Sequence, residues 1–173
     1  SQGRAVIGLG IGWNVPEFAR LGMTLPPVPE RQRALEEYVA IVEGVYGSEP
    51  FTYTGETFST ENSEIYPRPV QQPRPPILIA GAGERVTLRQ VAQYADACNF
   101  GASSNTGAIR GADDVARRFA VLKRHCDAVG RPYDDILRTH FTSWLFVAET
   151  ERDAMAKKAR YFPNGLTKEQ EYT

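Results

Sequence analysis

Histidine and cysteine are scarce in this sequence, which excludes several kinds of chemistry. The chain has 2 histidines and 2 cysteines among 173 residues, and it has no CxxC, HExxH or paired-aspartate motif. Neither a metal site nor a Ser/His/Asp or Cys/His arrangement can be assembled from this set in a credible order. Cys98 and Cys126 fall within expected core elements. We therefore expect two buried thiols, no disulfide and a reducing, cytoplasmic compartment.

Charge excess and long apolar runs are also missing. The net charge is -1, which gives no reason to expect nucleic acid or an anionic membrane as a partner. No apolar run approaches the roughly 20 residues that a membrane span needs. With 42% hydrophobic residues, the chain can form one domain with a real core, which we place at residues 1–173.

Strands and helices alternate along the chain. We expect strands at residues 4–9, 77–80, 97–100 and 139–147. Between them we expect a short helix capped by Asn14, a long helix with apolar positions from Leu35 to Tyr46, a helix that follows directly on Gly81–Glu84, and a helix over 113–129 ended by Gly130. A final helix begins at Thr150. A hairpin over 51–58 and a proline-rich passage over 66–76 interrupt this order, which predicts a parallel α/β sheet.

The end of the first expected strand is rich in glycine. Gly8, Gly10 and Gly12 alternate with apolar residues and lead into Trp13. The run is no dinucleotide fingerprint, because GxGxxG needs glycine where Trp13 or Val15 stands. The glycine face leaves room either for a planar ring walled by Trp13 or for a bulky neighbouring side chain. Both interpretations stay open.

Two further strand ends offer polar or glycine-rich segments. Residues 79–85 form a turn whose free N–H groups, with the charge of Arg85, suit a phosphate; alternatively this is a plain tight turn in which Glu84 stabilises the first helical turn. Asn99, Ser103 and Ser104 follow the next strand as ligand contacts or as loop caps. The two histidines are weaker candidates. We expect His125 on a solvated helix face, and His140 either towards the pocket or on the surface.

The chain as a whole resembles the bacterial luciferase-like monooxygenase family. The segments that carry the likeness are "GRAVIGLGIGWNVPEFARLG", "PPVPERQRALEEYVAIV", "FTYTGETFS", "PRPVQQPRPPILIAGAGERVTLRQVAQYADACNF" and "LKRHCDAVGRP". The resemblance implies a (β/α)8 TIM barrel, of which this chain supplies about strands 4 to 7, with an insertion at about residues 48–76. It also implies a flavin or deazaflavin at the C-terminal mouth of the barrel, with its phosphate near the turn after the fifth strand. The cofactor-binding residues expected on this basis are Gly10, Gly12, Trp13, Ile79, Ala80, Gly81, Ala82, Gly83, Glu84, Arg85, Asn99, Phe100 and Gly101.

The branch most similar to this chain consists of oxidoreductases that use the deazaflavin coenzyme F420. We therefore expect hydride transfer between F420 and an organic substrate, and an FMN-dependent monooxygenase is the alternative. Some sugar-phosphate dehydrogenases of this family carry a catalytic glutamate where this chain has Trp13, so that acid and that substrate class are not carried over, and the catalytic residue is left unknown. A sugar-phosphate-binding barrel that shares only the phosphate turn is a more distant alternative.

Chain length is the main departure from the family pattern. A complete barrel needs about 250 residues. We therefore expect a fragment, a truncated product or a chain completed by another copy or a partner chain. A non-catalytic half-barrel that serves as an interaction module is the alternative from another class.

Overall fold

Four parallel strands form the centre of the computed structural model, which describes residues 1–101, 109, 111–141 and 144–166. The strands are β1 (Ile7–Leu9), β4 (Ile77–Ala80), β5 (Ala97–Gly101) and β6 (Leu137–Phe141), and they lie in the order β1-β4-β5-β6. Neighbours in space are thus successive strands of this sheet, as in a barrel wound in one direction. This confirms the predicted parallel α/β sheet.

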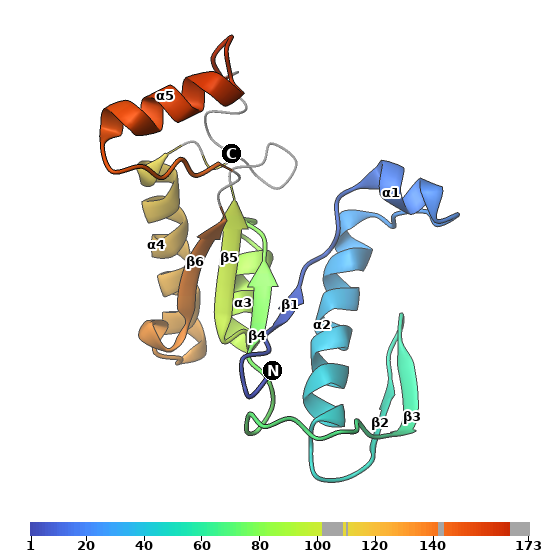
Figure 1. The fold of residues 1–173 in the computed structure, drawn as a ribbon. Helices are drawn as coiled ribbons and strands as arrows, with labels where there is room; N and C mark the ends of the chain where they lie inside the picture. Colours follow the sequence, from blue (N-terminus) through green and yellow to red (C-terminus); the bar gives the residue numbers. More distant parts are fainter. Residues whose placement is uncertain (102–108, 110, 142–143, 167–173) are drawn as a thin grey trace.

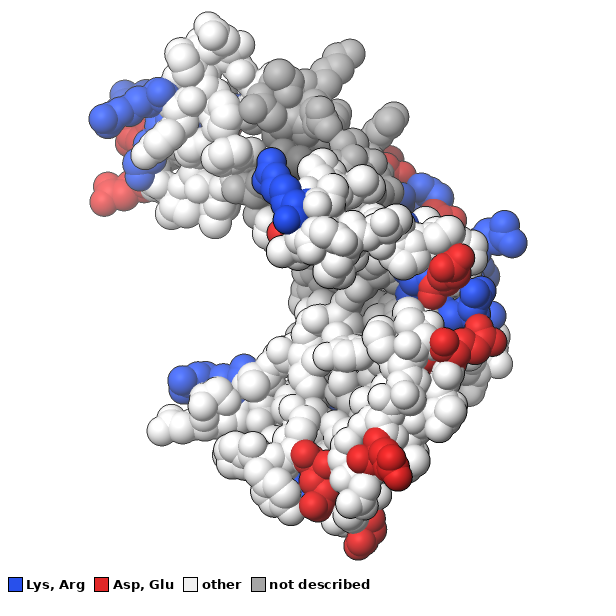
Figure 2. Space-filling model, turned by 90° about the vertical axis from the view of Figure 1, so that its right-hand side faces the viewer, with Lys and Arg blue, Asp and Glu red and all other residues white. Residues whose placement is uncertain are grey.

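Helices cover one face of this sheet. They are α2 (Val28–Val45), α3 (Thr87–Tyr94) and α4 (Ala112–Val129), with α2 beside β1 and with α3 and α4 behind β4 to β6 (Figure 1). The core lies between these helices and the sheet, and includes Val39, Ile79, Val91, Phe100 and Leu122. The opposite face carries no helix among the described residues. In Figure 2 the molecule is hollowed on one side at the height of the sheet, and the walls of this hollow are mostly uncharged.

Two short elements lie at the C-terminal ends of the strands. They are α1 (Val15–Arg20) after β1 and α5 (Glu151–Tyr161) after β6 (Figure 1). The predicted cap of α1 is confirmed, because the side chain of Asn14 accepts a hydrogen bond from the Glu17 N–H at 3.4 Å. The predicted end of α4 is also confirmed, since Gly130 has a left-handed φ of 71°.

A two-stranded hairpin packs beside α2. Its strands are β2 (Phe51–Thr54) and β3 (Ser59–Ser63), so the hairpin runs further than the predicted 51–58. The buried carboxylate of Glu37 on α2 accepts hydrogen bonds from the N–H groups of Glu56, Thr57 and Phe58 at 2.8–3.0 Å. These bonds, that of Phe58 first, lower the pKa of Glu37. The charged carboxylate therefore fixes the hairpin turn to α2.

Asp96 joins three strands at the N-terminal edge of the sheet. Its N–H donates to the Ile77 oxygen of β4 at 2.8 Å, and its main-chain oxygen accepts from the Leu137 N–H of β6 at 2.9 Å. Its carboxylate accepts a further bond from the Ile77 N–H at 2.8 Å and pairs with Arg74. This edge is thus held by side chains as well as by main-chain pairing.

The prediction of a strand over 139–147 is wrong in its boundaries. β6 covers only Leu137–Phe141, and residues 144–148 have no regular secondary structure. The apolar run packs locally instead of pairing: the rings of Trp144 and Phe162 lie 4.9 Å apart, and Phe146 contacts Tyr161 and Phe162. Aromatic contacts with α5 thus replace a longer strand.

Candidate functional site at the C-terminal edge of the sheet

The strand ends that the sequence singles out meet at one edge of the sheet. Leu9 pairs with Ile79, Ala80 with Asn99, and Gly101 with Phe141. Because side chains alternate along a strand, this register places Gly10, Ala80, Asn99 and Gly101 on the open face. Small or polar residues of β1, β4 and β5 therefore line the C-terminal end of that face, beside the exposed ring of Phe141 on β6.

Packing with neighbours does not explain the first two glycines of this face. A Cβ on Gly8 would have no described atom within 4 Å, and one on Gly10 would lie 3.4 Å from the Ala80 oxygen, an ordinary contact. Gly12 is different, since its φ of 72° favours glycine. The bulky-neighbour alternative thus finds no support among the described residues at Gly8 or Gly10. Trp13 follows with 51% of its surface exposed, so its ring is available to a ligand.

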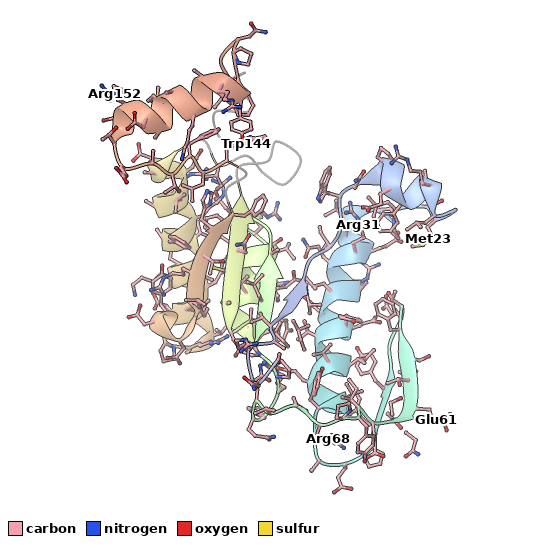
Figure 3. All side chains as sticks on the ribbon, viewed as in Figure 1. Met23, Arg31, Glu61, Arg68, Trp144 and Arg152 are labelled. Atoms are coloured by element: carbon pink, nitrogen blue, oxygen red, sulfur yellow. The ribbon has the colours of Figure 1, made fainter. Side chains whose placement is uncertain are left out.

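Arg31 of α2 holds the segment that carries Trp13. Its guanidinium donates to the main-chain oxygens of Ile11 at 3.2 Å, of Gly12, and of Pro26 at 2.7 Å. Arg31 and Trp144 both lie towards the end of the molecule where the strands finish (Figure 3). Sequence reasoning missed Arg31, because a charged residue in the first turn of an amphipathic helix gives no sign of which loop it reaches.

The turn after β4 depends on its glycines. Gly81 has a φ of 139°, and its N–H donates to the Asn99 oxygen at 2.8 Å. A Cβ on Gly83 would lie 2.8 Å from the Thr87 hydroxyl. The prediction that a helix follows this turn directly is wrong: α3 begins at Thr87, after a turn over 84–86, and the Leu88 N–H bonds back to the Gly83 oxygen at 2.9 Å.

The amide groups of residues 82–87 are left without main-chain partners. Within the part of the chain that the structure describes, none of them donates a hydrogen bond to another residue. Gly83 and Arg85 are exposed and Glu84 is half-buried, so the amides of these residues are open to water or to an anion that replaces it. The segment has the character of an anion-binding turn at a helix N-terminus.

Side chains of α4 contact the other side of this turn. His125 donates through Nε2 to the Glu84 oxygen at 2.8 Å, and Arg118 donates to the Ala82 oxygen at 3.4 Å. Arg117 pairs with the Glu84 carboxylate. Two expectations are therefore corrected: His125 is half-buried against the turn and not on a solvated face, and Glu84 pairs with α4 instead of lying in the first turn of α3.

Asn99 and Thr139 form a polar pair on the neighbouring strands. Asn99 donates to the Thr139 hydroxyl at 2.8 Å, and this hydroxyl donates to the Cys98 oxygen at 2.8 Å. Sequence reasoning missed Thr139. The predicted strand began at this residue, whereas β6 begins at Leu137, and the sequence does not show that Thr139 pairs with Asn99. Ser103 and Ser104 lie outside the described residues.

The remaining expected site residues are placed as follows. The side chains of Ile79 and Phe100 lie in the core, where Phe100 packs on Phe119 at 5.0 Å between ring centres, so a ligand at this edge reaches only their main chain. Arg85 is exposed on the turn, and His140 is exposed on β6. The predicted free thiols are confirmed: Cys98 and Cys126 are buried and unpaired, and burial raises the pKa of Cys98 to about 11.

A cavity of about 450 Å³ lies away from this edge, between α2, the hairpin and Tyr94. Its carboxylates already have partners: Glu36 contacts Arg89 and Gln90, Glu43 and Glu56 pair with arginines, and Glu37 holds the hairpin turn. The strand ends, and not this cavity, hold the candidate site.

Comparison with known proteins identifies the family. The model of the family described as luciferase-like monooxygenase matches residues 1–172. The chain belongs to this family. It is 31% identical over 171 residues to an F420-dependent glucose-6-phosphate dehydrogenase of Kineococcus radiotolerans, and 31% identical over 167 residues to the pyrimidine monooxygenase RutA of Acinetobacter baylyi. The resemblance inferred from the sequence is thus confirmed.

These matches span less than half of the relatives. They cover 98% and 93% of this luciferase-like chain, but 48% of the dehydrogenase and 41% of the monooxygenase. Among solved structures, the coenzyme F420-dependent tetrahydromethanopterin reductase of Methanopyrus kandleri has a TM-score of 0.66 at 20% identity, over 81% of this chain and 41% of the reductase. EDTA monooxygenase from Chelativorans sp. BNC1 has a TM-score of 0.68 at 16% identity, over 94% and 48%. The fold is therefore part of a luciferase-like TIM barrel.

No helix within the described ranges is long and apolar enough to cross a membrane.

Proposed function

We propose that this chain supplies the cofactor site of an oxidoreductase that uses F420 for hydride transfer to or from an organic substrate. The observation that carries the proposal is the run of amides over residues 82–87 that have no hydrogen-bond acceptor among the described residues, next to the small residues Gly10 and Ala80 at the strand ends. A strand end with glycine and alanine at Gly10 and Ala80 admits a flat ring, and amides without a protein partner admit an anion. A deazaflavin or a flavin that carries a phosphate combines both features.

The residues that would hold each part of the cofactor follow from this arrangement. The amides of Gly83, Glu84 and Arg85 would bind the phosphate, and the charge of Arg85 would attract it. Gly10 and Ala80 leave space on the open face for the ring, and the exposed Trp13 would form a wall of the pocket. When bound, the cofactor supplies the hydride chemistry, while the chain binds it, orients it and excludes water.

Two observations bear on the choice between F420 and FMN. The likeness to the F420-dependent dehydrogenase extends over 98% of the chain at 31% identity, slightly further than the 93% covered at the same identity by the monooxygenase RutA, which supports F420. An FMNH2-dependent dimethylsulfone monooxygenase of Pseudomonas fluorescens is 23% identical over 92% of the chain, which keeps an FMN-dependent monooxygenase as the second candidate. Trp13 offers no carboxylate at the position after the glycine run, so we do not propose a sugar phosphate as the substrate.

The test is equilibrium binding of F420 and of FMN to the purified chain, side by side, followed by cofactor fluorescence. Selective binding of F420 supports the proposal, and selective binding of FMN together with oxygen consumption supports the monooxygenase. Replacing Trp13 by Ala should weaken binding of the preferred cofactor by about fivefold, because an aromatic contact contributes on the order of 1 kcal/mol. Tyr66→Ala is the control, since Tyr66 is also exposed but belongs to the proline-rich passage. Absence of binding to both cofactors would leave the non-catalytic half-barrel.

A further inference from the structure

We infer that α4 positions the phosphate-binding turn through His125 and Arg118, which makes these two side chains positioning residues for the cofactor site. The inference rests on the function proposed above. It concerns residues that have no contact with the open face of the sheet: both belong to the helix that lies behind the turn.

Peptide geometry gives the first step of the argument. In a planar trans peptide, the oxygen of one residue and the N–H of the next point in opposite directions. The Ala82 oxygen is directed at Arg118, and the Glu84 oxygen at His125. The N–H groups of Gly83 and Arg85 therefore point away from α4. The two side chains orient two of the amides that the proposed site uses.

A third peptide of the turn is oriented by α3. The Gly83 oxygen accepts from the Leu88 N–H at 2.9 Å, so the Glu84 N–H points away from the start of that helix. Successive oxygens are thus held by α4, by α3 and again by α4. Each contact fixes the orientation of one peptide unit, which would otherwise rotate freely in a glycine-rich turn.

Charge placement gives the next step. A carboxylate beside a phosphate would repel it by an amount comparable to a weak ion pair. The Glu84 carboxylate pairs with Arg117 of α4. The same helix that takes the oxygens of the turn thus also holds its negative side chain on the side opposite to the free amides.

The choice of donor at residue 125 follows from its partner. A main-chain oxygen only accepts, so Nε2 of His125 carries the hydrogen in this contact. The side-chain amide of glutamine offers an N–H donor at similar reach. His125→Gln should therefore keep the positioning contact, whereas His125→Ala removes it.

The experiment compares cofactors with and without the phosphate on the full chain. FMN is compared with riboflavin, and F420 with its phosphate-free riboside, by fluorescence titration of the wild type, His125→Ala, His125→Gln and Arg124→Ala. Arg124 is an exposed neighbour on α4 and serves as the matched control. Circular dichroism and urea denaturation confirm that each variant folds. If His125→Ala does not fold, Arg118→Lys perturbs the other contact between α4 and the turn and is tested in its place.

The expected result is a selective loss. His125→Ala should weaken binding of the phosphate-bearing cofactor by about tenfold and change binding of its phosphate-free form less than twofold, with recovery in His125→Gln and no effect in Arg124→Ala. Equal weakening of both forms, or an unchanged preference for phosphate, would overturn the positioning role while leaving the proposed function standing. A wild type that does not distinguish the two forms would overturn the phosphate-binding turn itself.

Discussion

Gly83 lies where the proposed phosphate-binding turn packs against Thr87, the first residue of α3. A Cβ at this position would lie 2.8 Å from the Thr87 Oγ1 and 3.5 Å from its Cβ. Thr87 is 5% exposed, and its hydroxyl accepts a hydrogen bond from Gln32 Nε2 at 3.1 Å. In Gly83→Ala the threonine must rotate and lose this bond. Overpacking costs about 1–3 kcal/mol and a lost hydrogen bond about 1 kcal/mol, so we expect a destabilisation of about 2–4 kcal/mol.

The assay is urea denaturation followed by circular dichroism. Gly8→Ala is the matched control, because a Cβ there meets no described atom within 4 Å, and its stability should change by less than about 0.5 kcal/mol. The double variant Gly83→Ala/Thr87→Ala has no hydroxyl to displace, so its cost should fall short of the sum of the single costs by about 1 kcal/mol. A Gly83→Ala variant as stable as the control, or strict additivity in the double variant, would refute the steric explanation.

Two further outcomes are expected. Glu37→Gln should destabilise the chain at neutral pH and much less in acid: because the pKa of Glu37 is lowered below its ordinary value of 4.5, its contribution is complete above that value and lost as the pH falls through the folded pKa. Urea midpoints against pH test this, with the exposed Glu61→Gln as control; parallel curves for Glu37→Gln and wild type would contradict it. Cys98 and Cys126 should react with a disulfide reagent at pH 8 only after denaturation, since both are buried and burial raises their pKa values; rapid labelling of the native chain would contradict their burial.

The hydrophobic pattern of the sequence was sufficient to predict the order of strands and helices in the parallel sheet. The run Ile77-Leu78-Ile79 is apolar without alternation, which is typical of a strand covered by helices, and it forms the central strand β4. Local signals also held at Asn14 and Gly130, because a cap depends on residues a few positions apart. The run from Trp144 to Val147 gave a wrong prediction. It has the composition of a strand, but its aromatic rings pack against residues at the end of α5, which the local sequence does not show.

The candidate site could be predicted at the level of segments and not of contacts. Strand ends are visible in the sequence, and parallel pairing brings them to one edge. The residues that hold these segments come from elements 20 to 41 positions away, as with Arg31 on Ile11 and His125 on Glu84. Such pairings depend on how helices pack against the sheet, and a single polar residue on an amphipathic helix carries no sign of them.

The two edges of the sheet tolerate change differently, and Asp96 is the reason. The carboxylate, N–H and main-chain oxygen of Asp96 link β4, β5 and β6 far from the strand ends that form the candidate site. Lengthening or replacing a loop at the C-terminal edge leaves those bonds in place, whereas a substitution of Asp96 removes its carboxylate bonds to Ile77 and Arg74 and leaves only the main-chain bonds. The architecture therefore separates the residues that preserve the sheet from those of the candidate site. New specificities can arise at the second set without loss of the first.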